Sequence, residues 1–99
     1  MSLSFEWDRN KAAANLQKHR VSFVEASTAF DDPLARIFDD EDHPDAERRE
    51  ILIGRSILRR LLVVCYTERD DEVVRVISAR LTTKREQKDY EENTDIEIP

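Results

Sequence analysis

The chain has 99 residues, of which 39% are hydrophobic and 38% are charged, and its formal net charge is −6 at neutral pH. This length and composition are typical of one small globular domain that folds alone with little margin. No apolar run reaches the roughly eighteen residues that a membrane-spanning helix needs, so we expect no membrane association. The first ten residues lack the order of a secretory signal, basic and then apolar, and we therefore expect a cytoplasmic protein.

The charge is unevenly distributed along the chain. Residues 51–85 carry eight cationic and four anionic side chains, whereas residues 31–50 and 86–99 are strongly acidic. The distribution of charge decides which ligands a surface attracts, and the sum alone does not. The basic central block is therefore the place where an anionic ligand is expected.

The first thirty residues predict two helices. In residues 8–20, Asp8 is a suitable N-cap, alanines fill the middle, and cationic side chains lie at the C-terminal end, where the helix dipole favours them. In residues 22–30, Ser22 and Glu25 have the spacing of a capping box, and apolar residues recur at helical intervals.

Beyond residue 33 the apolar pattern changes from a helical period to one that is typical of strands. The predicted strands are ARIFDD (35–40), EILIGRSI (50–57), RLLVVCYTER (60–69) and VVRVISAR (73–80). Their spacing predicts an antiparallel sheet of about four strands, and the last strand, which is apolar almost throughout, is expected to lie inside the sheet. The pattern at residues 5–7 permits a further short strand.

Thr83 and Glu86 have the spacing of a second capping box, which predicts a helix over residues 84–93. Residues 94–99 carry no helical pattern and are expected to form a flexible tail. We therefore predict a single domain over residues 1–93 of the α+β class. It comprises two N-terminal helices, an antiparallel sheet of about four strands and one C-terminal helix, with the helices on one face.

Three cations gather at the end of the last predicted strand. Arg80 closes the strand, and Lys84 and Arg85 lie in the first turn of the next helix. Cations at a helix N-terminus are unfavourable by a few tenths of a kcal/mol each, unless an anion lies among them. The spacing leaves two interpretations open: an anion-binding site, or solvated cations with Arg80 paired to Asp89 or Glu86.

Seven stretches of the chain match one family pattern at the same spacing. They are FEWD (5–8), N..KH.VSF.EA (15–26), F.D (30–32), D..H (40–43), ER....IG.S (47–56), RLLVVCYTER (60–69) and ISAR...KRE...YE (77–91). In this ordered set the chain resembles the BrnT family, which comprises toxins of type II toxin–antitoxin pairs with a RelE-like ribonuclease fold.

The resemblance implies an endoribonuclease that cuts mRNA by attack of a ribose 2′-hydroxyl on the adjacent phosphate, without a metal or other cofactor. It also implies neutralisation by a small antitoxin, BrnA, which carries a ribbon-helix-helix DNA-binding region. The complex would repress its own operon, so DNA is contacted only through the antitoxin. The residues agree with the absence of a metal, because the sequence lacks the Cys and His spacing of a zinc site and its acidic run DDEDHPD lacks the EF-hand order.

Seven residues are candidates for this chemistry. The catalytic candidates are Arg80, His43, Tyr90 and Glu47, and the candidates for binding RNA phosphates are Lys84, Arg85 and Arg55. A guanidinium stays charged and can bind two phosphate oxygens at once, so Arg80 is the candidate for stabilising the transition state. Histidine is the side-chain type that ordinarily titrates near neutral pH, and His43 follows an acidic run on a polar loop. Glu47 can act as a carboxylate base, and the Tyr90 phenol can donate to phosphate.

Each candidate also has a structural interpretation that the sequence leaves open. Arg80 can pair with a carboxylate and hold the last helix to the sheet, and the Tyr90 ring can pack on the sheet. Glu47 can form a surface ion pair with one of the two arginines that follow it. Arg55 reaches the site only if its strand edge lies beside Arg80.

Three positions depart from the family pattern. Arg20 stands where glycine is common after a helix, so either Arg20 adopts a left-handed conformation at about 1 kcal/mol or the helix ends differently. Arg59 lies in a turn that usually contains a Gly-Arg pair, and Leu81 replaces a frequent lysine. The loss of that lysine supports a second hypothesis: a non-catalytic module whose basic surface binds the antitoxin and which takes part in operon autorepression.

Overall fold

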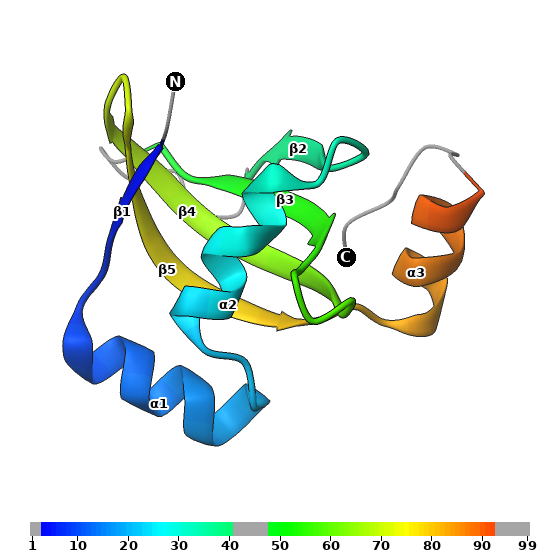
Figure 1. Cartoon of the computed structure of the whole chain (residues 1–99), viewed down its shortest axis with the longest axis horizontal. Coiled ribbons are helices and arrows are strands. Elements are labelled where there is room, and N and C mark those ends of the chain that lie inside the picture. The colour runs from blue at the N-terminus through cyan, green and yellow to red at the C-terminus, as the bar shows by residue number, and fades with distance from the viewer. Residues whose placement is uncertain (1–2, 41–47, 93–99) are drawn as a thin grey trace.

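The structure is a computed structural model and describes residues 3–40 and 48–92. Within these ranges the elements are β1 (Ser4–Glu6), α1 (Arg9–His19), α2 (Phe23–Thr28), the 3-10 helix η1 (Ala29–Asp31), β2 (Arg36–Asp39), β3 (Glu50–Arg55), β4 (Leu61–Asp70), β5 (Val73–Leu81) and α3 (Lys84–Glu91). The predicted α+β class and the three helices are confirmed (Figure 1). None of the helices in the described ranges is long and apolar enough to cross a membrane.

The sheet differs from the prediction of about four antiparallel strands. The described residues form a five-stranded sheet in the order β1-β5-β4-β3-β2, in which β1 runs parallel to β5 and the other neighbours are antiparallel. β1 has three residues and its partner lies far along the chain, with Ser4 opposite Val73, so no local pattern reveals the pairing. The predicted inner position of β5 is confirmed, because β1 and β4 flank it, and β4 is the central strand.

The first face of the sheet is covered by α1 and α2. Its core contains Val21, Phe23, Ala26, Leu62, Val64, Val76 and Ala79, and a neighbouring cluster contains Ala29, Leu52, Tyr66 and Val74. The buried amide of Asn15 fixes α1 to this face. Its nitrogen donates to the carbonyl oxygens of Val21 and Ala79 at 3.0 and 2.8 Å, and its oxygen accepts from the Ala79 N–H. These bonds satisfy backbone groups that would otherwise be costly to bury.

The opposite face carries α3, so the expectation of helices on one face is wrong. Ile53, Leu61 and Val63 point away from α1 and α2, and the ring of Tyr90 from α3 packs against them. Four consecutive buried residues, 61–64, show that β4 is covered on both faces. Figure 1 shows α1 and α2 across one side of the sheet and α3 apart from them, beyond the end of β5.

The helix ends follow the sequence signals, with two differences. Asp8 caps α1, and Arg20 ends it in the left-handed conformation with φ of 60°, which is one of the two outcomes considered for this position. The second helix is shorter than predicted, because α2 ends at Thr28 and the chain continues as η1. Ser22 caps α2, but the carboxylate of Glu25 does not complete the capping box and instead reaches the turn between β3 and β4.

Gly54 is required where η1 crosses β3. A Cβ atom at this position would lie 2.8 Å from the Ala29 carbonyl oxygen and 3.2 Å from the Cβ of Ala35. The absence of a side chain at Gly54 therefore lets the backbone of η1 at Ala29 pack closely against β3. It fixes η1, and with it Asp31 and Asp32, beside the end of β3.

Candidate functional site

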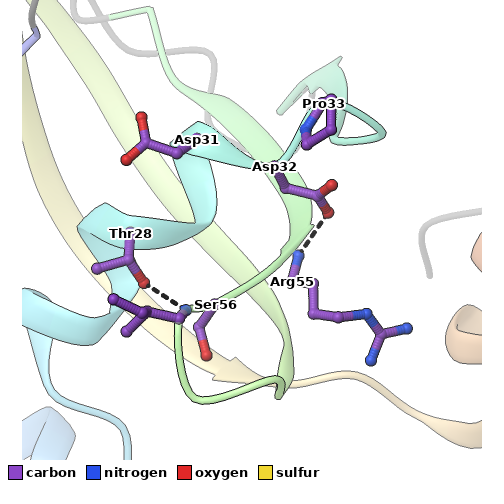
Figure 2. Close-up of a pocket in the computed structure, with 7 residues that line it drawn as sticks. Thr28, Asp31, Asp32, Pro33, Arg55 and Ser56 are labelled. Carbon is purple, nitrogen blue, oxygen red and sulfur yellow. Dashed lines mark hydrogen bonds between the residues drawn. The ribbon is translucent and has the colours of Figure 1, made fainter.

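Two hollows lie on either side of Arg55, the last residue of β3. The first has a volume of about 350 Å³ and is lined by Thr28, Asp31, Asp32, Pro33, Arg55, Ser56 and Ile57 (Figure 2). The second has a volume of about 250 Å³ and is lined by Arg55, Arg59, Arg60, Leu61, Leu81, Thr82 and Gln87. We call the first the apolar hollow, after its mainly apolar wall, and the second the basic hollow, after its three arginines. None of the described residues lining the basic hollow is acidic.

The basic hollow is formed by the turn between β3 and β4 and by the start of α3. The Ser56 N–H donates to the Arg60 carbonyl at 2.8 Å, and the Arg59 N–H donates to the Ser56 carbonyl at 2.9 Å. This tight turn leaves Arg59 in the left-handed conformation with φ of 64°. Thr82 closes the other side, where its N–H donates to the Leu61 carbonyl. Backbone hydrogen bonds therefore hold the walls of the hollow on both sides.

Arg60 is neutralised by a buried carboxylate. Its Nε donates to Glu25 Oε2 at 2.9 Å, Nη2 donates to Glu25 Oε1, and the Ser56 hydroxyl donates to the same carboxylate at 2.7 Å. The hydrogen bond from Arg60 is the main reason why the pKa of Glu25 is lowered, against the effect of its burial. Nη2 of Arg60 also donates to the Arg20 carbonyl at 2.9 Å. Arg60 thus anchors the turn to α2 and contributes little net charge to the hollow.

Arg55 and Arg59 are the cations that remain available to an anion. The Arg55 guanidinium lies 5.6 Å from the centroid of the Tyr90 ring and 3.7 Å from the Glu91 carboxylate. Both partners leave Arg55 partly exposed, and Arg55 lines both hollows. Figure 2 shows its side chain among the residues that line the apolar hollow. Arg59 is exposed, and its guanidinium has no ion-pair partner in residues 3–40 and 48–92.

Arg80 faces the first turn of α3, as its place in the sequence predicts, but a carboxylate occupies it. Its two terminal nitrogens donate to the two oxygens of Glu86 at 2.9 and 3.1 Å. The Glu86 side chain is 2% exposed and that of Arg80 is 35% exposed. Burial opposes the ionisation of Glu86, but hydrogen bonds from Arg80 and from the Thr83 N–H outweigh it and lower its pKa. Of the interpretations left open by the sequence, the pairing with Glu86 is the one observed, and Arg80 lines neither hollow.

Tyr90 connects α3 to η1. Its hydroxyl donates to Asp32, which also accepts from the N–H groups of Leu34 and Arg55 at 2.9 and 2.7 Å. Burial opposes the ionisation of Asp32, but these three donors outweigh it and lower the pKa of Asp32. Burial and the Asp32 carboxylate raise the pKa of Tyr90 to about 12. Tyr90 therefore remains protonated at neutral pH, with its hydroxyl already bound and its ring on the sheet.

The other predicted site residues are only partly brought together. Lys84 is exposed in the first turn of α3, and Arg85 is exposed there too but already has an interaction partner. His43 and Glu47 lie outside the described residues. Within the ranges that the structure covers, no group of three His, Cys, Asp or Glu side chains is arranged to hold a metal ion.

Sequence reasoning missed Asp32 and the different roles of Arg59 and Arg60. The sequence does not distinguish the two adjacent arginines. The conformation of the turn places Arg60 against Glu25 and leaves Arg59 exposed to solvent. A weak signal for Asp32 was available, because an Asp before Pro33 at a helix end often accepts backbone N–H groups.

Comparison with known proteins gives a family and a fold. The model of the family described as "Ribonuclease toxin, BrnT, of type II toxin-antitoxin system" matches residues 7–86. Among solved structures, the crystal structure of the Brucella abortus ribonuclease toxin BrnT is similar, with a TM-score of 0.64 and 22% sequence identity. The similarity covers 84% of this chain and 100% of that one, and it concerns the fold. A comparison with curated proteins gives no match.

Proposed function

Because the chain belongs to the BrnT family of ribonuclease toxins of type II toxin–antitoxin systems, we propose that it is an endoribonuclease toxin that cleaves mRNA at the basic hollow. The main support is the partly exposed Arg55 together with the exposed Arg59, which give a protein of net charge −6 a local site for phosphate. Lys84, one helical turn or less from Thr82 at the rim, adds a further cation for the RNA backbone.

In the proposed reaction the ribose 2′-oxygen attacks the adjacent phosphorus and the bond to the 5′-oxygen of the next nucleotide breaks. The 2′-hydroxyl loses its proton to a base, and the leaving 5′-oxygen gains one. The products are a 2′,3′-cyclic phosphate and a 5′-hydroxyl, without a metal ion. Negative charge grows on the phosphate oxygens in the transition state, and guanidinium groups that bind these oxygens stabilise it.

We assign the phosphate contacts to Arg55 and Arg59 and give Arg80 a positioning role in the resting protein. Arg80 holds Glu86, which caps α3, so it sets the distance between the start of α3 and the basic hollow. Its direct contact with RNA would require a phosphate to displace Glu86. His43 and Glu47 stay predictions as proton-transfer groups, and Tyr90 would have to exchange Asp32 for a substrate oxygen to act as a donor.

The partner proposed for this toxin is a BrnA-like antitoxin with a ribbon-helix-helix region. DNA is then contacted through the antitoxin, and the complex takes part in repression of its own operon. Support comes from the family, since a type II system pairs the toxin with a protein that neutralises it.

The proposal is tested by incubating the purified chain with end-labelled single-stranded RNA, and with mRNA under translation, in the presence of EDTA. We expect cleavage that yields 2′,3′-cyclic phosphate ends, and loss of on the order of 10²-fold in rate for Arg55→Ala. Lys11→Ala, which removes a cation from the exposed side of α1, is the matched control and should cleave normally. Intact RNA in every assay, or 3′-hydroxyl ends, would refute the mechanism.

A second function is favoured by the ion pair of Arg80 and by Leu81, whose side chain lines the basic hollow and is 47% exposed. An arginine neutralised by Glu86 and an apolar residue at the rim are suited to a protein partner. On this alternative the chain is a non-catalytic module that binds the antitoxin. RNA that stays intact together with a stable complex with the antitoxin would identify this function.

A further inference from the structure

The apolar hollow has the features of a site that receives a side chain from another protein. Its wall is mainly apolar, and it opens beside Ile57 and Leu58, which are 76% and 63% exposed. Leu34, next to Pro33 in the wall, is also a large exposed apolar residue. Contiguous exposed apolar side chains around a hollow mark protein interaction sites more often than they occur by chance on a soluble surface.

The walls of this hollow are already fixed in the unbound protein. The Ile57 N–H donates to the Thr28 hydroxyl at 2.9 Å, and the Arg55 N–H donates to Asp32 at 2.7 Å (Figure 2). These bonds tie the turn after β3 to α2 and η1. The residues that line the hollow therefore need not be ordered when a segment binds. Binding then avoids the loss of conformational entropy that ordering would cost, and the affinity is higher.

The charges around the hollow specify the chemistry of the partner. Asp31 lies on one side and the Arg55 guanidinium on the other, as Figure 2 shows. Asp32 already accepts hydrogen bonds from three donors, but the exposed Asp31 carboxylate has no partner in the part of the chain that the structure describes. A complementary segment carries a cation for Asp31 on one side of an apolar side chain and an anion for Arg55 on the other.

RNA fits this hollow less well than protein does. No aromatic side chain is among the described residues that line it, whereas unpaired bases are usually held by stacking on aromatic rings. The Asp31 carboxylate would also repel the phosphate of a nucleotide. The exposed side chains of Leu34, Ile57 and Leu58 provide apolar contact area for a protein partner.

We propose that the apolar hollow is the anchor site of the neutralising protein partner. An apolar side chain of the partner fills it, with a basic residue at Asp31 and an acidic residue at Arg55. Because Arg55 lines both hollows, the same acidic residue then occupies the phosphate site of the basic hollow. This inference rests on the proposed function, because it requires that the protein has an antitoxin. It adds where the antitoxin contacts the toxin and which types of side chain make the contact.

The test uses the whole chain and a panel of designed dodecapeptides with one leucine between one lysine and one glutamate at several spacings. Binding is followed by NMR through the backbone amide signals at about 1 mM peptide, where weak segments bind. We expect at least one peptide to shift the signals of Asp31 and Ile57. Ile57→Ser should weaken binding about tenfold by loss of apolar contact, and Asp31→Asn about threefold by loss of one exposed ion pair. Leu3→Ser, an exposed apolar residue at the other end of the sheet, is the matched control and should bind normally.

Three results would overturn the inference. They are the absence of shifts at the hollow with every peptide, equal binding of a peptide whose lysine is replaced by glutamate, and shifts at the hollow with an RNA dinucleotide but not with peptide. RNA cleavage is measured on the same samples. Cleavage by wild type and by Ile57→Ser without peptide binding refutes only the anchor site, whereas peptide binding without any RNA cleavage refutes the nuclease and leaves the anchor site standing.

Discussion

Arg20 and Arg59 adopt a backbone conformation that glycine adopts at lower cost. Their φ angles are 60° and 64°, in the left-handed region where a Cβ atom is crowded. Arg20 ends α1, and its carbonyl oxygen accepts a hydrogen bond from Arg60. Arg59 lies in the turn that forms the basic hollow. The two residues thus have the same strain, but only Arg59 contributes a cation to the hollow.

Replacing Arg20 by glycine should stabilise the protein. The left-handed conformation costs a non-glycine residue about 1 kcal/mol, and Arg20→Gly removes this cost while keeping the backbone carbonyl that Arg60 contacts. We expect urea denaturation to show a gain of about 0.5–1 kcal/mol, less than the full cost because glycine also gains entropy in the unfolded chain. Arg20→Ala, which keeps the Cβ atom, should give no such gain, and an equal gain from both variants would contradict the explanation.

At the scale of elements, α3 is joined to the rest of the fold by polar side chains near both ends. Glu86 binds Arg80 at its start, and Tyr90 binds Asp32 near its end while the ring rests on Ile53, Leu61 and Val63. The bond between Arg80 and Glu86 crosses the loop before α3, and the bond between Tyr90 and Asp32 joins residues 58 positions apart. The position of α3 beside the basic hollow therefore depends on a few side chains that can be changed one at a time.

Tyr90→Phe should loosen α3 without unfolding the protein. The variant keeps the ring but loses the hydrogen bond to Asp32, at a cost of about 1 kcal/mol. We expect the amides of α3 to exchange about fivefold faster with deuterium, because they exchange through local opening. Amides of α1, which Asn15 binds to β5, serve as the internal reference and should not change. Unchanged exchange in α3 would show that the Tyr90 hydroxyl does not hold the helix.

The three carboxylates that join elements also predict a loss of stability in acid. The pKa values of Glu25, Asp32 and Glu86 are lowered in the folded protein from ordinary values of 4.5, 3.8 and 4.5. Their contribution is complete above these ordinary values, and it is lost as the pH falls through the lower pKa values of the folded state. The free energy of unfolding, measured in urea at a series of pH values, should therefore be flat near neutrality and fall below about pH 4.5. Glu86→Gln should start from a lower stability and fall less steeply in acid, and an equally steep fall would contradict its assignment.

At the scale of the whole molecule, the charges are separated along the sheet. The end of β4 and the turn that follows it are acidic, with Asp70, Asp71 and Glu72, whereas the turn between β3 and β4 at the opposite end carries Arg59 and Arg60. RNA should therefore approach the basic end and be repelled by the acidic one.

The binding of single-stranded RNA should depend on salt through only a few phosphate contacts. We expect the logarithm of the affinity to fall linearly with the logarithm of the salt concentration. The slope should correspond to roughly two to four phosphate contacts. Arg59→Ala should lower this slope by about one contact, and Lys11→Ala on α1 should leave it unchanged. Fluorescence anisotropy at several salt concentrations measures both values. An affinity that does not change with salt would exclude phosphate binding at this end.

The sequence predicts local structure well and long-range contacts poorly. Caps at Asp8, Ser22 and Thr83 mark the helix starts because each cap bonds to residues two or three positions away. The pairing of β1 with β5 and the placement of α3 on the second face depend on residues far apart in the chain, and neither was predicted. The candidate site shows the same division. The cationic block is visible in the sequence as a prediction, but the contacts of Glu25 with Ser56 and Arg60, which hold the turn beside the hollow, cross more than thirty residues.

The single-turnover rate of RNA cleavage by Arg59→Gly, compared with that by Arg20→Gly, shows whether the basic hollow binds the reacting phosphate. Both substitutions relieve the same backbone strain, so a difference between them reports the cation in the basic hollow rather than stability. We predict that Arg59→Gly cleaves single-stranded RNA on the order of 10²-fold more slowly than wild type, whereas Arg20→Gly keeps the wild-type rate. Wild-type cleavage by Arg59→Gly would contradict the assignment of the phosphate site to this hollow.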